Sequence, residues 1–73
     1  MYIYEDHFDG SLYTSCRPLD YEERHCKKCK DVDLLLGYAT TRKEACELLK
    51  SSANIDGWNH NYIQAFIAAN WDK

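Results

Sequence analysis

The sequence predicts a small α+β domain. A three-stranded antiparallel sheet, made of an N-terminal hairpin plus a third strand, is expected to pack against two C-terminal helices. The first six residues alternate with the two-residue period of a strand, an apolar run lies in the middle of the chain, and apolar residues after position 41 recur at helical spacing. With 73 residues the chain can build one core only, so residues 1–73 are expected to form a single domain.

Residues 1–6 and 11–16 are predicted to form the hairpin. Between them, Asp9-Gly10 is suited to the positive φ angles of a tight turn. A two-residue loop pairs Phe8 with Ser11 and Asp6 with Tyr13, whereas a longer loop would change this register. We expect the core to lie on the more aromatic of the two faces. The aromatic face carries Tyr2, Tyr4, Phe8 and Tyr13, and the other face carries Ile3, His7, Leu12 and Cys16.

Arg17-Pro18 ends the second strand, because proline cannot donate a hydrogen bond to a neighbouring strand. Residues 18–31 then form a polar connection, and the apolar residues 32–39 are predicted to be a buried third strand. Thr41 and Glu44 fit a capping box, in which side-chain oxygens accept hydrogen bonds from free backbone amides. The helix that follows, residues 42–51, has a core-facing stripe of Ala45, Leu48 and Leu49.

A loop around Asp56-Gly57, spanning residues 51–59, is expected before the second helix. Asn61 is predicted to cap that helix, which ends near Trp71. Its apolar stripe consists of Ile63, Phe66, Ile67 and Trp71. Each helix therefore has one apolar face, and we expect both helices to cover the same face of the sheet.

The formal net charge is −3, yet the charges are unevenly placed. Residues 24–30 contain four bases and no acid: Arg24, Lys27, Lys28 and Lys30. These side chains could contact phosphates while Tyr21 stacks on a base, which makes a small nucleic-acid-binding regulator one alternative function. Such proteins usually carry an excess of positive charge, because their affinity comes largely from neutralising phosphates. The net charge therefore favours the simpler interpretation, in which the four bases are solvated and balance nearby acids.

The chain contains no apolar run close to the roughly 18 residues that cross a bilayer. Its first ten residues lack the basic region and the apolar stretch of a secretory signal. We therefore expect no membrane contact and a reducing, cytoplasmic location.

The most distinctive local motif is Cys26-Lys27-Lys28-Cys29. Two intervening residues allow both thiolates to bind one tetrahedral metal ion, as in a zinc knuckle. Cys16 is the best third ligand, because it ends the second strand just before the connection. Cys46, His7 and His25 compete for the fourth position.

Two other interpretations of the cysteines stay open. They can be reduced, unligated thiols, with Cys46 packed beside the apolar stripe of the first helix. Alternatively, Cys26 and Cys29 form a redox pair whose thiolates are stabilised by the neighbouring lysines. Redox pairs of the thioredoxin kind begin a helix, however, whereas this pair precedes a strand.

No catalytic motif is recognisable, and an acid and a nucleophile are not placed beside His7, His25 or His60. We therefore expect a protein that is not an enzyme. Tyr21 and Trp58 are expected to be exposed, and exposed aromatic side chains favour contacts with other proteins.

Several short motifs follow one another in a particular order over residues 1–50: Gly10-Ser11-Leu12-Tyr13-Thr14-Ser15, Leu19-Asp20-Tyr21, the segment 25–33 with the cysteine pair, Gly37-Tyr38 and Glu44-Ala45. In this order they resemble small uncharacterised proteins encoded by phages and prophages of Gram-positive bacteria. The chain departs from that pattern at Lys30, where glycine is frequent, and at His25, where tyrosine is frequent. The resemblance implies a bacterial cytoplasm and supports only Cys26 and Cys29 as ligands, and it implies no established activity.

The sequence and the resemblance together predict a non-enzymatic phage or prophage accessory protein that binds and modulates a host or phage protein. A structural zinc ion at Cys26 and Cys29 would stiffen the connection between the second and third strands. If two chains share one ion, the protein is a homodimer. The nucleic-acid-binding regulator and the thiol-redox protein are the alternatives.

Overall fold

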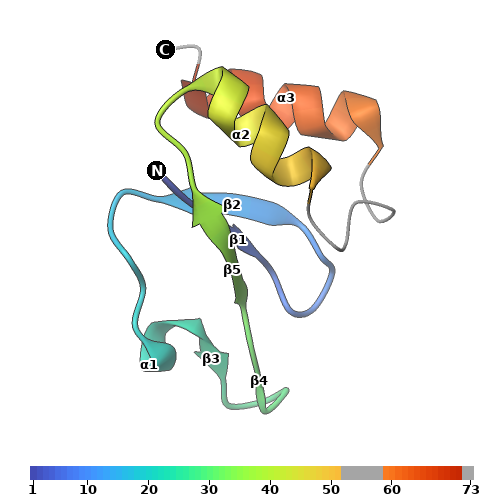
Figure 1. Cartoon of the computed structure of the whole chain (residues 1–73). Coiled ribbons are helices and arrows are strands. Elements are labelled where there is room, and N and C mark those ends of the chain that lie inside the picture. Colours follow the sequence, from blue (N-terminus) through green and yellow to red (C-terminus); the bar gives the residue numbers. More distant parts are fainter. Residues whose placement is uncertain (52–58, 72–73) are drawn as a thin grey trace.

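The computed structural model describes residues 1–51 and 59–71 and confirms the predicted fold class. A three-stranded antiparallel sheet has the strand order β2-β1-β5 (Figure 1). Its strands are β1 (Tyr2–Glu5), β2 (Leu12–Ser15) and β5 (Leu34–Tyr38). The central strand is thus the N-terminal one, and the hairpin partner and the third strand flank it.

Two helices lie together on one side of this sheet (Figure 1). Helix α2 (Arg42–Lys50) begins after Thr41, whose hydroxyl oxygen accepts a hydrogen bond from the Glu44 amide, as predicted. Helix α3 (His60–Trp71) begins two residues earlier than the predicted cap at Asn61 implies. Its first amides are capped by Asn59, whose side-chain oxygen accepts the Tyr62 N–H at 2.7 Å, and Asn61 lies inside the helix.

The connection between β2 and β5 is not irregular throughout. It contains a four-residue helix, α1 (Tyr21–Arg24), and a second small sheet made of β3 (His25–Cys26) and β4 (Asp31–Val32). These elements lie below the main sheet in the view of Figure 1, on the side opposite the helices. The predicted strand 32–39 is therefore interrupted at Asp33, which lies between β4 and β5.

The hairpin register differs from the two-residue-loop prediction by two positions. Tyr4 pairs with Tyr13 and Glu5 with Leu12, and the loop is closed by a hydrogen bond of 2.8 Å from the Asp6 amide to the Ser11 carbonyl. The side chain of Asp6 accepts amide hydrogen bonds inside this longer loop, which stabilises it. A shift of two residues keeps the paired side chains of β1 and β2 on their predicted faces, whereas His7 and Phe8 now lie in the loop.

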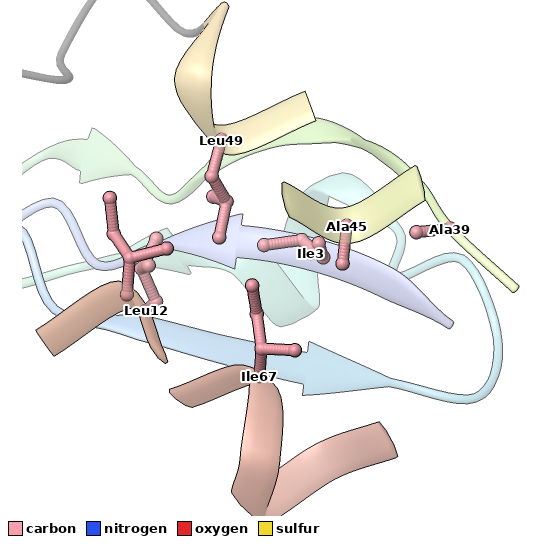
Figure 2. Close-up of a cluster of buried hydrophobic side chains, with 7 residues drawn as sticks. Ile3, Leu12, Ala39, Ala45, Leu49 and Ile67 are labelled. Atoms are coloured by element: carbon pink, nitrogen blue, oxygen red, sulfur yellow. The ribbon is translucent and has the colours of Figure 1, made fainter. Parts of the chain in front are cut away.

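The prediction that the aromatic face points toward the core is wrong. The helices cover the opposite face: Ile3 and Leu12 are buried there with residues of α2 and α3, whereas Phe8 is 82% exposed. Figure 2 shows Ala45 and Leu49 of α2 and Ile67 of α3 directed toward Ile3. Aliphatic side chains fill the narrow space between helices and sheet. Among the described residues, the buried cluster on this face consists of Ile3, Leu12, Ala39, Ala45, Leu49, Ile63 and Ile67.

The aromatic face nevertheless contains one buried side chain, Tyr4, which is 1% exposed. Its ring stacks on Tyr13 with 5.5 Å between the centroids, and its hydroxyl oxygen accepts the Leu19 N–H at 2.8 Å. The chain that leaves β2 therefore returns over this ring.

The third strand is less buried than predicted. Leu34, Leu35 and Tyr38 are between 44% and 56% exposed. The pairing of β5 with β1 is interrupted by a bulge opposite Ile3 and Tyr4. Gly37 lies beside the bulge, and a Cβ atom there would approach Leu48 to 2.8 Å. A side chain at residue 37 would therefore require the Leu48 side chain of α2 to move.

The helix stripes are confirmed. Ala45, Leu49, Ile63 and Ile67 are buried, and Leu48, Phe66 and Trp71 pack against the same core. The predicted loop around Asp56-Gly57 and the side chain of Trp58 lie outside the described residues. Within the residues that the structure describes, none of the helices is both long and apolar enough to cross a membrane.

Candidate metal centre

We call residues 17–33 the cysteine loop, and polar contacts hold its first half. Asp20 caps α1 by accepting the Glu23 amide at 2.8 Å, and the Glu23 carboxylate accepts the Asp20 amide in return. Arg17 forms a bidentate ion pair with Glu23. This hydrogen-bonded pair lowers the pKa of Glu23 to about 2. Because α1 has no buried residue, such contacts take the place of a core.

The cysteine pair lies in the turn between β3 and β4. The Lys30 amide donates to the Cys26 carbonyl at 2.7 Å, and the Cys29 amide donates to the Cys26 sulfur at 3.4 Å. Lys30 has a φ angle of 57°, which is the left-handed conformation that glycine adopts most readily. The turn therefore directs the Cys29 amide at the Cys26 sulfur, and this favours the thiolate form that binds metals.

His7 comes to this turn from the hairpin loop. One ligand atom from each of His7, Cys26 and Cys29 lies within 4.8 Å of the other two. The two cysteines lie three positions apart, but His7 is nineteen residues before Cys26 in the chain. Only the folding of the cysteine loop against the hairpin brings the imidazole to the thiols.

Asp33 fixes the orientation of His7. Its Oδ1 atom accepts the His7 backbone amide at 3.0 Å and the ring Nδ1–H at 2.6 Å, while Oδ2 accepts the Tyr13 hydroxyl at 2.5 Å. Because an ionised carboxylate only accepts, the ring hydrogen is assigned to Nδ1 and the free lone pair to Nε2. A carboxylate that holds the outer nitrogen of a histidine is the usual support of a metal-binding imidazole.

The same contacts set the electrostatics of the site. The hydrogen bond with Asp33 raises the pKa of His7 above its ordinary value. Burial raises the pKa of Asp33, but hydrogen bonds from Tyr13 and His7 outweigh it and hold that pKa below its ordinary value. The Cys29 amide lowers the pKa of Cys26 to about 7, whereas the neighbouring Cys26 sulfur raises the pKa of Cys29. Near neutral pH, one of the two sulfurs is therefore poised to be a thiolate.

Two sulfurs and one imidazole nitrogen are ligands that Zn²⁺ prefers. Their convergence fits a tetrahedral ion with three protein ligands, whose fourth position is filled by water or by a donor from outside this group. Asp6 and Asp33 form a second group of possible ligands with the same His7. Carboxylates alone suit harder ions, but the two thiols favour zinc at the first group.

The structure does not bring the other predicted ligands into this site. Among the described residues, neither Cys16 nor Cys46 belongs to a group of three or more possible ligands. Cys16 is exposed beyond the end of β2, and Cys46 packs against the core from α2. His25 stacks on Tyr21 with 5.3 Å between the ring centroids. All four cysteines are free thiols.

The basic residues of the loop are not equivalent. Lys27, Lys28 and Lys30 are exposed, as the solvated interpretation expects. Arg24 is half-buried instead: its Nη1 donates to the Asp33 carbonyl at 3.3 Å, and its Nε is buried without a hydrogen-bond partner among the described residues. Arg24 therefore joins the loop to the start of β5 rather than extending a basic surface.

Sequence reasoning considered His7 only as one of three competitors, and it did not identify Asp33. The contact between His7 and Asp33 depends on the length of the hairpin loop. Because β1 ends at Glu5, His7 lies in the loop and not in the strand. No local pattern links Asp33 to a residue twenty-six positions earlier.

Comparisons with known proteins return no match: no protein-family model, no curated protein and no solved structure is significantly similar to this chain.

Proposed function

We propose that this chain is a small, non-enzymatic binding protein in which a zinc ion on His7, Cys26 and Cys29 holds the cysteine loop as a partner-binding surface. The observation that carries the proposal is the convergence of these three ligands within 4.8 Å from two separate loops. None of residues 16–33 is buried, so the loop has little apolar packing to keep its shape. A bound metal ion commonly supplies that stability in very small domains.

The exposed side chains of the loop favour a protein partner. Tyr21 is 61% exposed and lines a shallow hollow together with Glu22, His25 and Lys27. An aromatic ring next to charges of both signs is typical of protein contact sites, whereas a nucleic-acid site would need more basic charge than this loop offers. The resemblance to phage and prophage proteins is the reason to seek the partner among bacterial host and phage proteins of the cytoplasm.

The zinc site is tested by comparing the mass of the reduced protein under native and denaturing conditions, after zinc is added and excess is removed. The wild-type chain is expected to retain one zinc ion. Cys26→Ser and His7→Asn are expected to lose it, since asparagine can still donate to Asp33 but has no atom at the Nε2 position. Cys16→Ser is the matched control and should retain the ion. Zinc retention by His7→Asn, or a metal-free wild-type chain, would contradict the site.

Partner binding needs its own test. Proteins retained from a bacterial lysate by the immobilised zinc-loaded chain would be purified, and their affinity measured by calorimetry. For a partner bound at the cysteine loop, Tyr21→Ala is expected to raise Kd about tenfold or more, because buried aromatic anchors dominate such interfaces. Phe8→Ala, which changes a ring exposed on the hairpin loop, is the control. Equal effects of the two variants would place the contact elsewhere.

A thiol-redox function is the second proposal, because the Cys29 amide lowers the pKa of Cys26 to about 7 beside a second thiol. In that reaction the two thiols would reduce a substrate disulfide, lose two electrons and two protons, and form a Cys26–Cys29 disulfide. A reversible disulfide in glutathione buffers, together with absent zinc binding, would favour this function. If Cys26 and Cys29 remain reduced in glutathione buffers, the thiol-redox function is ruled out.

A further inference from the structure

The two outer edges of the main sheet differ. Helix α3 covers the outer edge of β2: the Tyr62 hydroxyl accepts the Leu12 N–H at 2.8 Å, and the Thr14 hydroxyl donates to Asn70 at 2.8 Å. Strand β5, at the other edge, pairs with β1 only, within the part of the chain that the structure describes. One edge of the sheet is thus capped, and the other is open.

The backbone of β5 is oriented to accept another strand. Met1 and Ala39 exchange both of their hydrogen bonds, at 2.9 Å and 2.5 Å. Hydrogen-bonded and non-hydrogen-bonded pairs alternate along an antiparallel ladder, so the next pair, Tyr2 and Tyr38, is of the second kind. The amide and carbonyl of Tyr38 therefore face away from β1, toward the open edge.

The side chains along this edge are apolar. Leu34, Leu35 and Tyr38 are 51%, 44% and 56% exposed. No charged residue and no proline occurs between positions 34 and 41, although proteins commonly place lysine or proline on an open edge to prevent strand pairing. The edge thus combines unpaired backbone groups with apolar side chains and lacks the usual protection.

We propose that β5 pairs with β5 of a second copy of this chain, antiparallel about a two-fold axis, to form a continuous six-stranded sheet. The symmetry brings the same apolar patch of each chain against the other, with no charged residue between positions 34 and 41 to oppose it. Beyond the two ends of β5, the symmetry also brings β4 of one chain, which carries the exposed Asp31, toward the start of α2 of its partner, which carries the exposed Lys43. Because α3 caps β2, pairing ends at the dimer and cannot continue as a filament.

The test compares sedimentation velocity of the full chain from micromolar to millimolar concentration with that of Tyr38→Lys. The wild-type chain is expected to form a dimer, and Tyr38→Lys is expected to be monomeric at the same concentrations. Tyr21→Lys is the matched control, because Tyr21 is similarly exposed and also has one ring partner, but lies on α1. It should leave the dimer intact.

Hydrogen exchange tests the contact without any substitution. The Tyr38 amide of the wild-type chain should exchange fast at low concentration and slowly at high concentration, since only the dimer pairs it. A monomeric wild-type chain at millimolar concentration would overturn the proposal, as would a dimer that survives Tyr38→Lys. A dimer that Cys26→Ser dissociates and Tyr38→Lys does not would be held by a shared metal ion, and this too would overturn it. The proposed zinc site and partner surface do not depend on the outcome.

Discussion

The helix-covered sheet and the cysteine loop are held together by different forces. Among the described residues, the buried side chains that the sheet and its two helices enclose are all apolar, so hydrophobic burial stabilises that half. In the cysteine loop no residue is buried, and hydrogen bonds and one exposed ion pair take the place of a core, beside three side chains that could hold a metal ion. The difference shows how a chain of 73 residues can fold with a single small core and still keep a long connection ordered.

Hydrogen bonds to Tyr4 and to Asp33 connect these halves. The Tyr4 hydroxyl accepts the Leu19 amide, and Asp33 accepts hydrogen bonds from Tyr13 of β2 and from His7 of the hairpin loop. The tyrosine hydroxyls in these bonds belong to Tyr4 and Tyr13, whose rings stack on each other on the sheet. The position of the proposed metal centre therefore depends on the core, and none of the proposed ligands belongs to the buried cluster.

The largest expected effect is on the core. Leu49→Ala should lower the free energy of unfolding by about 2–5 kcal/mol, because Leu49 is fully buried between α2 and the sheet. Leu19→Ala, the same change in the cysteine loop, should cost less than about 1 kcal/mol, because Leu19 is only half-buried. Urea unfolding of both variants checks the comparison. If both variants lose a similar amount of unfolding free energy, the cysteine loop is stabilised by apolar burial as the core is, which would contradict the comparison.

Asp33→Asn should weaken zinc binding about 10–100-fold, which is the usual effect of removing a carboxylate that supports a ligating histidine. Competition with a chromophoric chelator measures this. Tyr13→Phe removes the other hydrogen bond to the same carboxylate but leaves the contact to His7, so it should change zinc affinity much less. Equal effects would show that Asp33 acts through the fold and not through His7.

Lys30→Gly should raise the free energy of unfolding by about 0.5 kcal/mol. The left-handed conformation costs a lysine about 1–2 kcal/mol, and the greater entropy of glycine in the unfolded chain offsets part of the gain. Lys28→Gly, two positions earlier and without a positive φ angle, should instead be destabilising. Thermal unfolding of both variants checks the sign, and a loss of stability in Lys30→Gly would contradict the described turn.

The smallest effect is a pH dependence of the contact between the halves. Asp33 raises the pKa of His7. The stability that His7 adds to the folded state is therefore complete below pH 6.5 and is lost as the pH rises through its folded-state pKa. Since the pKa of Asp33 is lowered, its contribution is complete above pH 3.8 and is lost as the pH falls. The pair should therefore stabilise the metal-free protein most between these values.

This measurement is best made in Cys26→Ser, because the low pKa of the Cys26 thiol acts in the opposite direction above neutrality. Urea unfolding at a series of pH values should show less stability at pH 8 than at pH 6. In the double variant with Asp33→Asn that difference should shrink. If the stability difference between pH 6 and pH 8 is unchanged in the double variant, it arises from groups other than the His7–Asp33 pair.

Much of the helix-covered half could be predicted from the sequence. Helix periodicity identified the stripes that include Leu49 and Ile67, and Thr41 marked where α2 begins. The orientation of the hairpin was predicted wrongly, because both of its faces carry apolar side chains. Aliphatic Ile3 and Leu12 fit the space below two helices, whereas the rings of the other face are large and carry hydroxyls that need polar partners.

The sequence by itself determined the α+β class, the two helices and the turn that holds Cys26 and Cys29, because each of these depends on spacing within a few neighbouring residues. Only the tertiary structure decided that His7 meets the thiols, that Asp33 orients it and that Cys16 and Cys46 stay apart from them. Such contacts join residues far apart in the chain, and their geometry depends on loop lengths and on which face of the sheet the helices cover. The open edge of β5 has the same origin, because capping by α3 reaches one side of the sheet and leaves the other available for pairing.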